Sequence, residues 1–132
     1  MWISHTQKKC FGDVFKSLSG GKKACNMTKQ LGVYIDDRGI LRCKGRLEHA
    51  NLSEAARNPI LLPKHERFTC LVVEKMHKEQ LHSGVSQTLS RVRFRFWIPS
   101  GRSVVKWIVR QCRVCRRHEG GAYKTPPMAP LP

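Results

Sequence analysis

Two histidines and two cysteines constrain this chain more than any other feature of its sequence. They form the pattern His-x4-His-x29-Cys-x2-Cys, which consists of His77, His82, Cys112 and Cys115. Two imidazole nitrogens and two thiolates complete the tetrahedral set that Zn²⁺ takes in structural sites, where no position is left open for a substrate. The pattern therefore predicts one structural zinc ion that ties two distant segments of the chain together.

A Cys-x2-Cys pair is also typical of redox centres. Reactive thiolates are favoured at helix N-termini, whereas this pair is expected to follow a helix C-terminus, whose dipole opposes negative charge. Three neighbouring arginines would favour a thiolate, and His118 could replace one of the ligands. The zinc interpretation accounts better for the pattern, because a site that uses His118 leaves the upstream histidine pair idle.

The other cysteines indicate neither a disulfide framework nor a second motif. Cys10, Cys25, Cys43 and Cys70 have no regular spacing, so we expect buried or incidental thiols. The first ten residues carry basic side chains where a signal peptide needs an apolar stretch, and no apolar run is long enough to span a membrane. We therefore expect a soluble, intracellular protein.

Apolar side chains recur at helical spacing in three segments between residues 65 and 118. The first helix, residues 65–80, has two apolar sides: Phe68, Leu71, Val72 and Met76 on one, and Cys70, Val73 and His77 on the other. The second is predicted from Ser83-Gly84, with Val85, Leu89, Val92 and Phe96 on its inner face. The third is predicted from Ser100, with Val104, Val105, Ile108 and Cys112. The expected fold is mainly α, a small three-helix bundle in which zinc joins the first helix to the end of the third.

Residues 91–96 allow a second interpretation, because Arg-Val-Arg-Phe-Arg-Phe alternates strictly and alternation is typical of a half-buried strand. The longer window fits the helix better, so the helix is preferred.

The residues before the bundle, 1–64, are predicted to form an extension with a short helix near residues 11–18. Two short apolar runs flank Asp-Asp-Arg-Gly at residues 36–39, and these turn residues favour a β-hairpin over about residues 33–43. Prolines at both ends of residues 59–63 favour an extended connector. We expect the hairpin and this connector to cover the outer side of the first helix. Residues 119–132 have the composition of a Pro-rich linker.

The charge balance indicates a polyanionic partner. The 132 residues include 25 Lys and Arg against nine Asp and Glu, a net charge of +16, and no acidic residue lies between Glu79 and Glu119. Nucleic acid is the expected partner. A fragment whose charge is balanced by an acidic neighbour in a longer protein would have the same composition, and so would a helix face that is only exposed to solvent. The predicted phosphate contacts are Arg91, Arg95, Arg102, Lys106, Arg110, Arg113, Arg116 and Arg117.

The residues between the two ligand pairs resemble the histidine-cysteine zinc-binding domain of retrotransposon integrases, most closely the BEL/Pao group. The matching pattern is His77-x4-His82-Ser-Gly-Val-x2-Thr88-Leu89-x2-Val92-x3-Phe96-Trp97-Ile98-Pro99-x2-Arg102-x9-Cys112-x2-Cys115-Arg116-Arg117. The resemblance extends to residues 39–47, 59–64 and 127–132, and Trp2-Ile3 resembles the join after a ribonuclease H region. Phe94 stands where the family usually has a polar residue, and Cys43 where a small aliphatic one is common. Neither departure changes the ligand set.

The resemblance implies a domain that binds DNA at the element ends and helps to assemble the integrase, by self-association or with other integrase domains. It also implies a location in the nucleus or in a cytoplasmic particle, with neither a membrane nor a small-molecule substrate as partner. Strand transfer in integrases belongs to a later core with two Asp and a Glu. The acids after Glu66 are Glu74, Glu79 and Glu119, which could not hold two metal ions without dismantling the first helix. We therefore expect no catalytic core here and no enzyme activity.

A different function class remains open from the sequence. The chain could be a zinc-stabilised protein-interaction module without nucleic-acid binding, displaying Trp97, Trp107 and Phe94. Salt-dependent DNA binding distinguishes the two functions, because only phosphate contacts release counterions.

Overall fold

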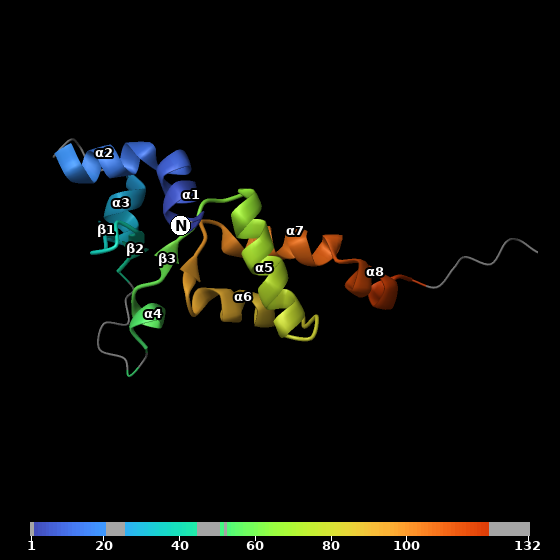
Figure 1. Cartoon of the computed structure of the whole chain (residues 1–132). Coiled ribbons are helices and arrows are strands. Elements are labelled where there is room, and N and C mark those ends of the chain that lie inside the picture. The colour runs from blue at the N-terminus through green and yellow to red at the C-terminus, as the bar shows by residue number, and fades with distance from the viewer. Residues whose placement is uncertain (1, 21–25, 45–50, 52, 122–132) are drawn as a thin grey trace, which may run out of the picture.

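A bundle of helices is joined through a short sheet to a group of N-terminal helices (Figure 1). This computed structural model describes residues 2–20, 26–44, 51 and 53–121. The helices are α1 (Trp2–Cys10), α2 (Gly12–Gly20), α3 (Asn26–Leu31), α4 (Glu54–Arg57), α5 (Arg67–Glu79), α6 (Val85–Arg93), α7 (Gly101–Gln111) and α8 (Arg113–Glu119). The strands are β1 (Val33–Ile35), β2 (Leu41–Cys43), β3 (Ile60–Leu61) and β4 (Phe96–Trp97).

Helices α5, α6 and α7 form the predicted bundle, and each contacts the other two. In α7 the pairs Val104-Val105 and Ile108-Val109 recur after four residues, so they share one face, and that face is buried. The core of the bundle contains Leu62, Cys70, Val73, Met76, Leu89, Val92, Phe96, Ile98, Val104, Val105, Ile108, Val109 and Cys115. The prediction of a mainly α fold around a small three-helix bundle is confirmed.

The segment that allowed two interpretations contains both a helix and a strand. Helix α6 ends at Arg93 and β4 begins at Phe96, so the helix predicted through Phe96 is wrong in its last turn. Strand β4 pairs in parallel with β3, and the N–H of Leu62 donates to the carbonyl of Trp97 at 2.8 Å. The alternating pattern indicated a strand, but where the helix ends and the strand begins depends on the pairing with β3, which lies far back in the sequence.

Strands β1 and β2 form the predicted hairpin, in which Val33 lies opposite Cys43. Its turn uses Gly39 at a φ of 71°, in the left-handed region that glycine adopts most readily. Strand β2 pairs with β3, so the sheet has the order β1-β2-β3-β4 and crosses the predicted boundary at residue 64. A second core lies around this sheet: Val14, Val33, Leu41, Cys43 and Leu61.

Helix α1 was not predicted, and it is attached to the sheet by one buried side chain. Gln7 is fully buried, and its Nε2 donates to the carbonyls of Leu41 (2.9 Å) and Leu61 (2.6 Å). Its Oε1 accepts from the N–H of Leu41 at 2.8 Å. Gln7 therefore satisfies backbone groups on two neighbouring strands, β2 and β3. The predicted short helix corresponds to α2, whereas α3 and α4 were not predicted.

The connector packs where it was predicted to, because Leu62 lies in the core against which Phe68 and Val72 of α5 pack, whereas the hairpin does not cover the outer side of α5, contrary to the prediction. The apolar side chains of the hairpin pack around α2 and β3. Ile3 of α1 packs against the core of the bundle instead, Met76 is buried inside that core, and Leu71 is 46% exposed. Apolar spacing places side chains on a face of a helix, but it does not say which element covers that face.

In the described ranges no helix is long and apolar enough to cross a membrane. Cys25 and most of the predicted Pro-rich linker, from residue 122 onwards, lie outside the described residues.

Candidate metal centre

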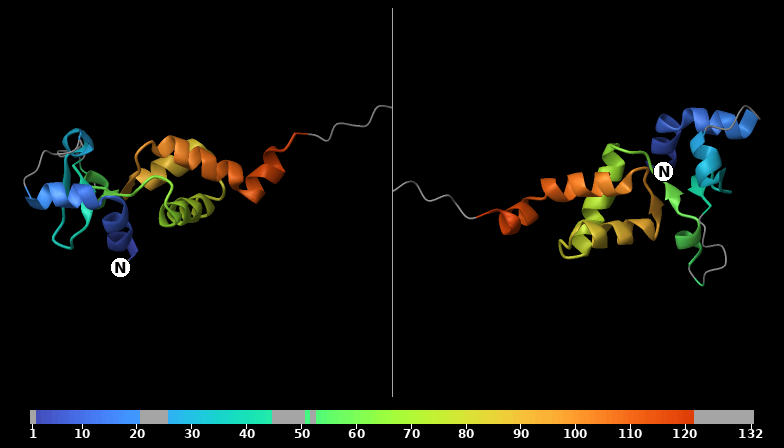
Figure 2. Two further views of the ribbon diagram at one scale, coloured as in Figure 1. Left: turned by 90° about the horizontal axis from the view of Figure 1, so that it is seen from above. Right: turned by 180° about the vertical axis from the view of Figure 1, so that it is seen from behind.

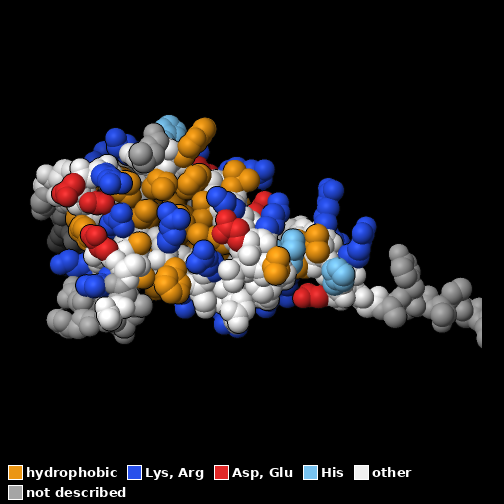
Figure 3. Space-filling view, turned by 60° about the horizontal axis from the view of Figure 1, so that its bottom comes forward, with side chains coloured by type: hydrophobic (Ala, Val, Ile, Leu, Met, Phe, Trp, Pro, Cys, Tyr) orange, Lys and Arg blue, Asp and Glu red, His pale blue; other side chains and the backbone are white. Residues whose placement is uncertain are grey.

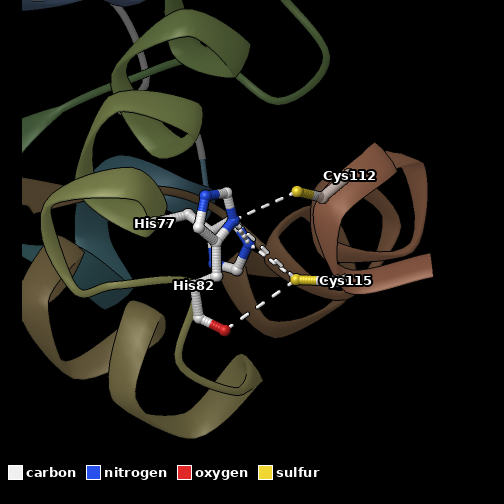
Figure 4. Close-up of side chains that lie close together, drawn as sticks. All are labelled: His77, His82, Cys112 and Cys115. Carbon is white, nitrogen blue, oxygen red and sulfur yellow. Dashed lines mark hydrogen bonds between the residues drawn. The ribbon is translucent and has the colours of Figure 1, made fainter. Parts of the chain in front are cut away.

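Four side chains from three parts of the bundle meet at one point (Figure 4). His77 lies in the last turn of α5, His82 in the turn before α6, Cys112 between α7 and α8, and Cys115 in the first turn of α8. The chain makes a left-handed turn at Leu81 and His82, with φ angles of 51° and 58°. The N–H of His82 donates to the carbonyl of His77 at 3.0 Å, which holds the two histidines together.

The four ligand atoms lie within 4.8 Å of one another, and four of the distances between them are close to those of a tetrahedral zinc ion. His77 Nε2 lies 3.2 Å from Cys115 Sγ and 3.3 Å from His82 Nδ1. The same nitrogen of His82 lies 3.2 Å from Cys112 Sγ and 3.9 Å from Cys115 Sγ. Tetrahedral bonds of about 2.0–2.3 Å require separations of about 3.3–3.8 Å. The four residues are thus positioned to coordinate one metal ion, as predicted, with His77 offering Nε2 and His82 offering Nδ1.

A hydrogen-bonded threonine fixes the orientation of His77. His77 Nδ1 lies 3.2 Å from Thr88 Oγ1, and this hydroxyl donates to the carbonyl of Ser83 at 3.2 Å. Because the hydroxyl proton is used in that bond, Thr88 accepts from Nδ1–H, which leaves Nε2 free for the metal. Burial lowers the pKa of His77, and the adjacent His82 lowers it further, so the ring favours the neutral form that a metal requires. Thr88 was not among the site residues predicted from the sequence.

Thr88→Val should weaken zinc binding by about 10- to 100-fold, because valine keeps the side-chain shape but cannot accept from His77. Competition with a chromophoric chelator measures this affinity. Thr69→Val is the matched control: Thr69 is also fully buried on a helix, but its hydroxyl donates to the carbonyl of Pro63 at 2.8 Å. Equal losses of affinity in the two variants would mean that a general loss of stability, and not the orientation of His77, explains the result.

The cysteine pair lies at a helix N-terminus, which corrects the expectation that it follows only a helix C-terminus. Cys112 ends α7 and is also the N-terminal cap of α8. Burial opposes a thiolate at Cys112, but hydrogen bonds from the N–H groups of Cys115 and Val114 lower its pKa below the ordinary value. Burial raises the pKa of Cys115, and the adjacent Cys112 raises it further. Zinc would supply the positive charge that stabilises both thiolates together.

The site is a structural type of centre. Its four ligand positions are filled by protein atoms, although a hollow of about 370 Å³ lies beside His82 and Cys112. Within the described residues, His, Cys, Asp and Glu side chains gather closely enough to hold a metal ion at this one place. That the chain has no catalytic core stays a prediction.

The remaining described cysteines lie elsewhere. Cys10 is exposed, and Cys43 and Cys70 are buried. Burial raises the pKa of the Cys43 thiol to about 12, so this thiol is inert at neutral pH.

The predicted phosphate contacts fall into separate groups, and all eight are exposed. Three share the outer face of α7: Arg102, Lys106 and Arg110. Three more lie on α8: Arg113, Arg116 and Arg117. Arg91 and Arg95 line a small hollow beside α5 and so lie apart from the α7 row. Arg93, which the sequence analysis did not single out, lines a hollow of about 180 Å³ together with Arg102.

Comparison with curated proteins and with solved structures gave no significant match. Comparison with protein-family models matched residues 64–120 to the integrase zinc binding domain. The matched segment contains α5 to α8 and all four ligands. Residues 64–120 thus match the integrase zinc-binding family, and they form a domain in which His77, His82, Cys112 and Cys115 are positioned to hold one zinc ion.

Proposed function

We propose that this chain is a zinc-stabilised module of a BEL/Pao-type retrotransposon integrase, which binds the DNA of the element ends through its phosphates and helps to assemble the integrase. The observation that carries the proposal is the complete four-ligand site inside the segment that matches the integrase family. A complete ligand set stabilises a fold and leaves no position for a substrate. In this proposal the chain is not an enzyme by itself, and strand transfer belongs to a catalytic core outside these residues.

The outer face of α7 supports the DNA-binding part of the proposal. Arg102, Lys106 and Arg110 follow one another at steps of four residues, so they share one side of the helix. In the part of the chain that the structure describes, no carboxylate lies within 4.0 Å of these cations. Unpaired cations in a row suit a polyanion better than they suit a neutral partner.

We expect the affinity for duplex DNA to fall steeply with salt. Each of Arg102→Ala, Lys106→Ala and Arg110→Ala should lower the slope of log affinity against log salt by about one, without changing sequence preference. Fluorescence anisotropy over a salt series measures the slope. Lys16→Ala, on the exposed side of α2, is the control and should leave the slope unchanged.

The second candidate function is a protein-interaction module without nucleic-acid binding. Phe94 and Trp107 are each 52% exposed, which supports it, whereas Trp97 is half-buried. DNA binding that does not depend on salt, or equal slopes in wild type and the three α7 variants, would favour this second function over the first.

A further inference from the structure

An apolar strip runs along one side of the molecule, away from the metal centre. It consists of Trp2 on α1, Phe68, Leu71 and Val72 on α5, and Phe94 and Phe96 after α6. Trp2 is 77% exposed, Leu71 46% and Phe94 52%. Figure 3 shows a broad area of hydrophobic side chains on one face of the molecule, with Lys and Arg around and between them. Exposed apolar side chains that lie together in this way mark interaction sites, whereas single ones are ordinary on a protein surface.

Two adjoining hollows give the apolar strip its shape. One, of about 670 Å³, lies between α1 and α5, and the other, of about 160 Å³, lies between α5 and the end of α6. Both are lined by Val72 and Lys75, so the two hollows lie next to each other. In the left view of Figure 2, α1 (dark blue) and α5 (yellow-green) both lie on the lower side of the molecule.

The rim of the apolar strip is basic. Its cations are Lys9, Arg67, Lys75, Arg91 and Arg95, and its acids are Glu66 and Glu79. Each acid faces a lysine: Glu66 lies 2.8 Å from Lys9, and Glu79 lies 3.9 Å from Lys75. Within the described ranges the three arginines form no ion pair, so the rim has unpaired positive charge.

We propose that the apolar strip is a docking site for an acidic, amphipathic segment of a partner protein. Apolar side chains of the segment enter the two hollows, and its carboxylates face Arg67, Arg91 and Arg95. This occupant fits better than a second copy of the same surface, because two basic rims would then face each other. It also fits better than nucleic acid, because phosphates gain nothing from the apolar floor, whose exposed members are Trp2, Leu71 and Phe94.

The test uses the full chain loaded with zinc and a fluorescent helical peptide of about 15 residues, about four turns, with Leu at positions i, i+3, i+4 and i+7 and Glu elsewhere. A scrambled peptide of the same composition is the control for attraction by charge alone. At physiological ionic strength the amphipathic peptide should bind at least ~10-fold more tightly than the scrambled one. Equal binding of the two peptides overturns the proposal.

Leu71→Glu and Phe94→Ser should each lower the affinity for the amphipathic peptide by about 10-fold or more, because apolar side chains at the centre of an interface contribute most of the binding energy. Neither residue belongs to the core of the bundle, and thermal melting confirms that the variants fold. Leu18→Glu, 37% exposed on α2 outside the strip, is the matched control and should not alter binding.

Two other results also overturn the proposal. One is a wild-type dimer in sedimentation that Leu71→Glu converts to a monomer, because a second copy would then cover the strip. The other is a Leu71→Glu variant that loses as much affinity for a short DNA duplex as it loses for the peptide.

Discussion

Chelation of zinc should unfold the helical domain of residues 64–120. A structural zinc site contributes on the order of 10 kcal/mol to folding, and the whole stability of a small domain is only about 5–15 kcal/mol. The site joins the end of α5 to the start of α8. His77 is 2% exposed and Cys115 is 7% exposed, so without metal both are buried polar groups with no cation between them. The bundle therefore loses the connection that the four ligands make between α5 and α8.

The measurement is circular dichroism of the full chain in excess chelator, with the metal content determined by mass spectrometry. We expect one zinc per chain before chelation and a large loss of helical signal after it. Cys115→Ser should show the same loss without chelator, whereas Cys10→Ser, at an exposed position, should behave as wild type. A helical signal that survives after the metal is shown to be gone would refute the structural role of the site.

Gln7→Ala should destabilise the protein by about 3 kcal/mol, the second-largest effect that we expect. The change leaves two carbonyls and one N–H without the partners that Gln7 provides at Leu41 and Leu61. Each buried polar group left unsatisfied costs about 1–3 kcal/mol, unless water reaches it. Chemical denaturation with saturating zinc measures the change in the free energy of unfolding.

Gln7→Glu separates the hydrogen bonds from the packing, because glutamate has nearly the same shape but cannot donate to the two carbonyls. It should destabilise the protein at least as much as Gln7→Ala does. Gln30→Ala, at an exposed position on α3, is the control and should change stability by less than about 0.5 kcal/mol. If Gln7→Ala falls within that same small range, α1 is not held by Gln7.

The sequence by itself determined the features that depend on residue type and short-range spacing. The ligands His77, His82, Cys112 and Cys115 could be predicted because only a few side chains bind zinc, and their pairs occur at typical separations. The three helices of the bundle could be predicted because apolar residues repeat at the helical period. The β1–β2 hairpin could be predicted because Gly39 and the acids before it suit a turn.

The tertiary structure alone decided the features that depend on a partner distant in sequence. Phe96 and Trp97 form a strand because β3 lies beside them. The polar Gln7 of α1 is buried because three backbone groups of β2 and β3 bond to it. Cys112 caps a helix because the chain turns there to bring both sulfurs to the histidines. Leu71 stays exposed because the hairpin packs elsewhere. Local periodicity assigns a side chain to a face, but only the packed chain determines what that face meets.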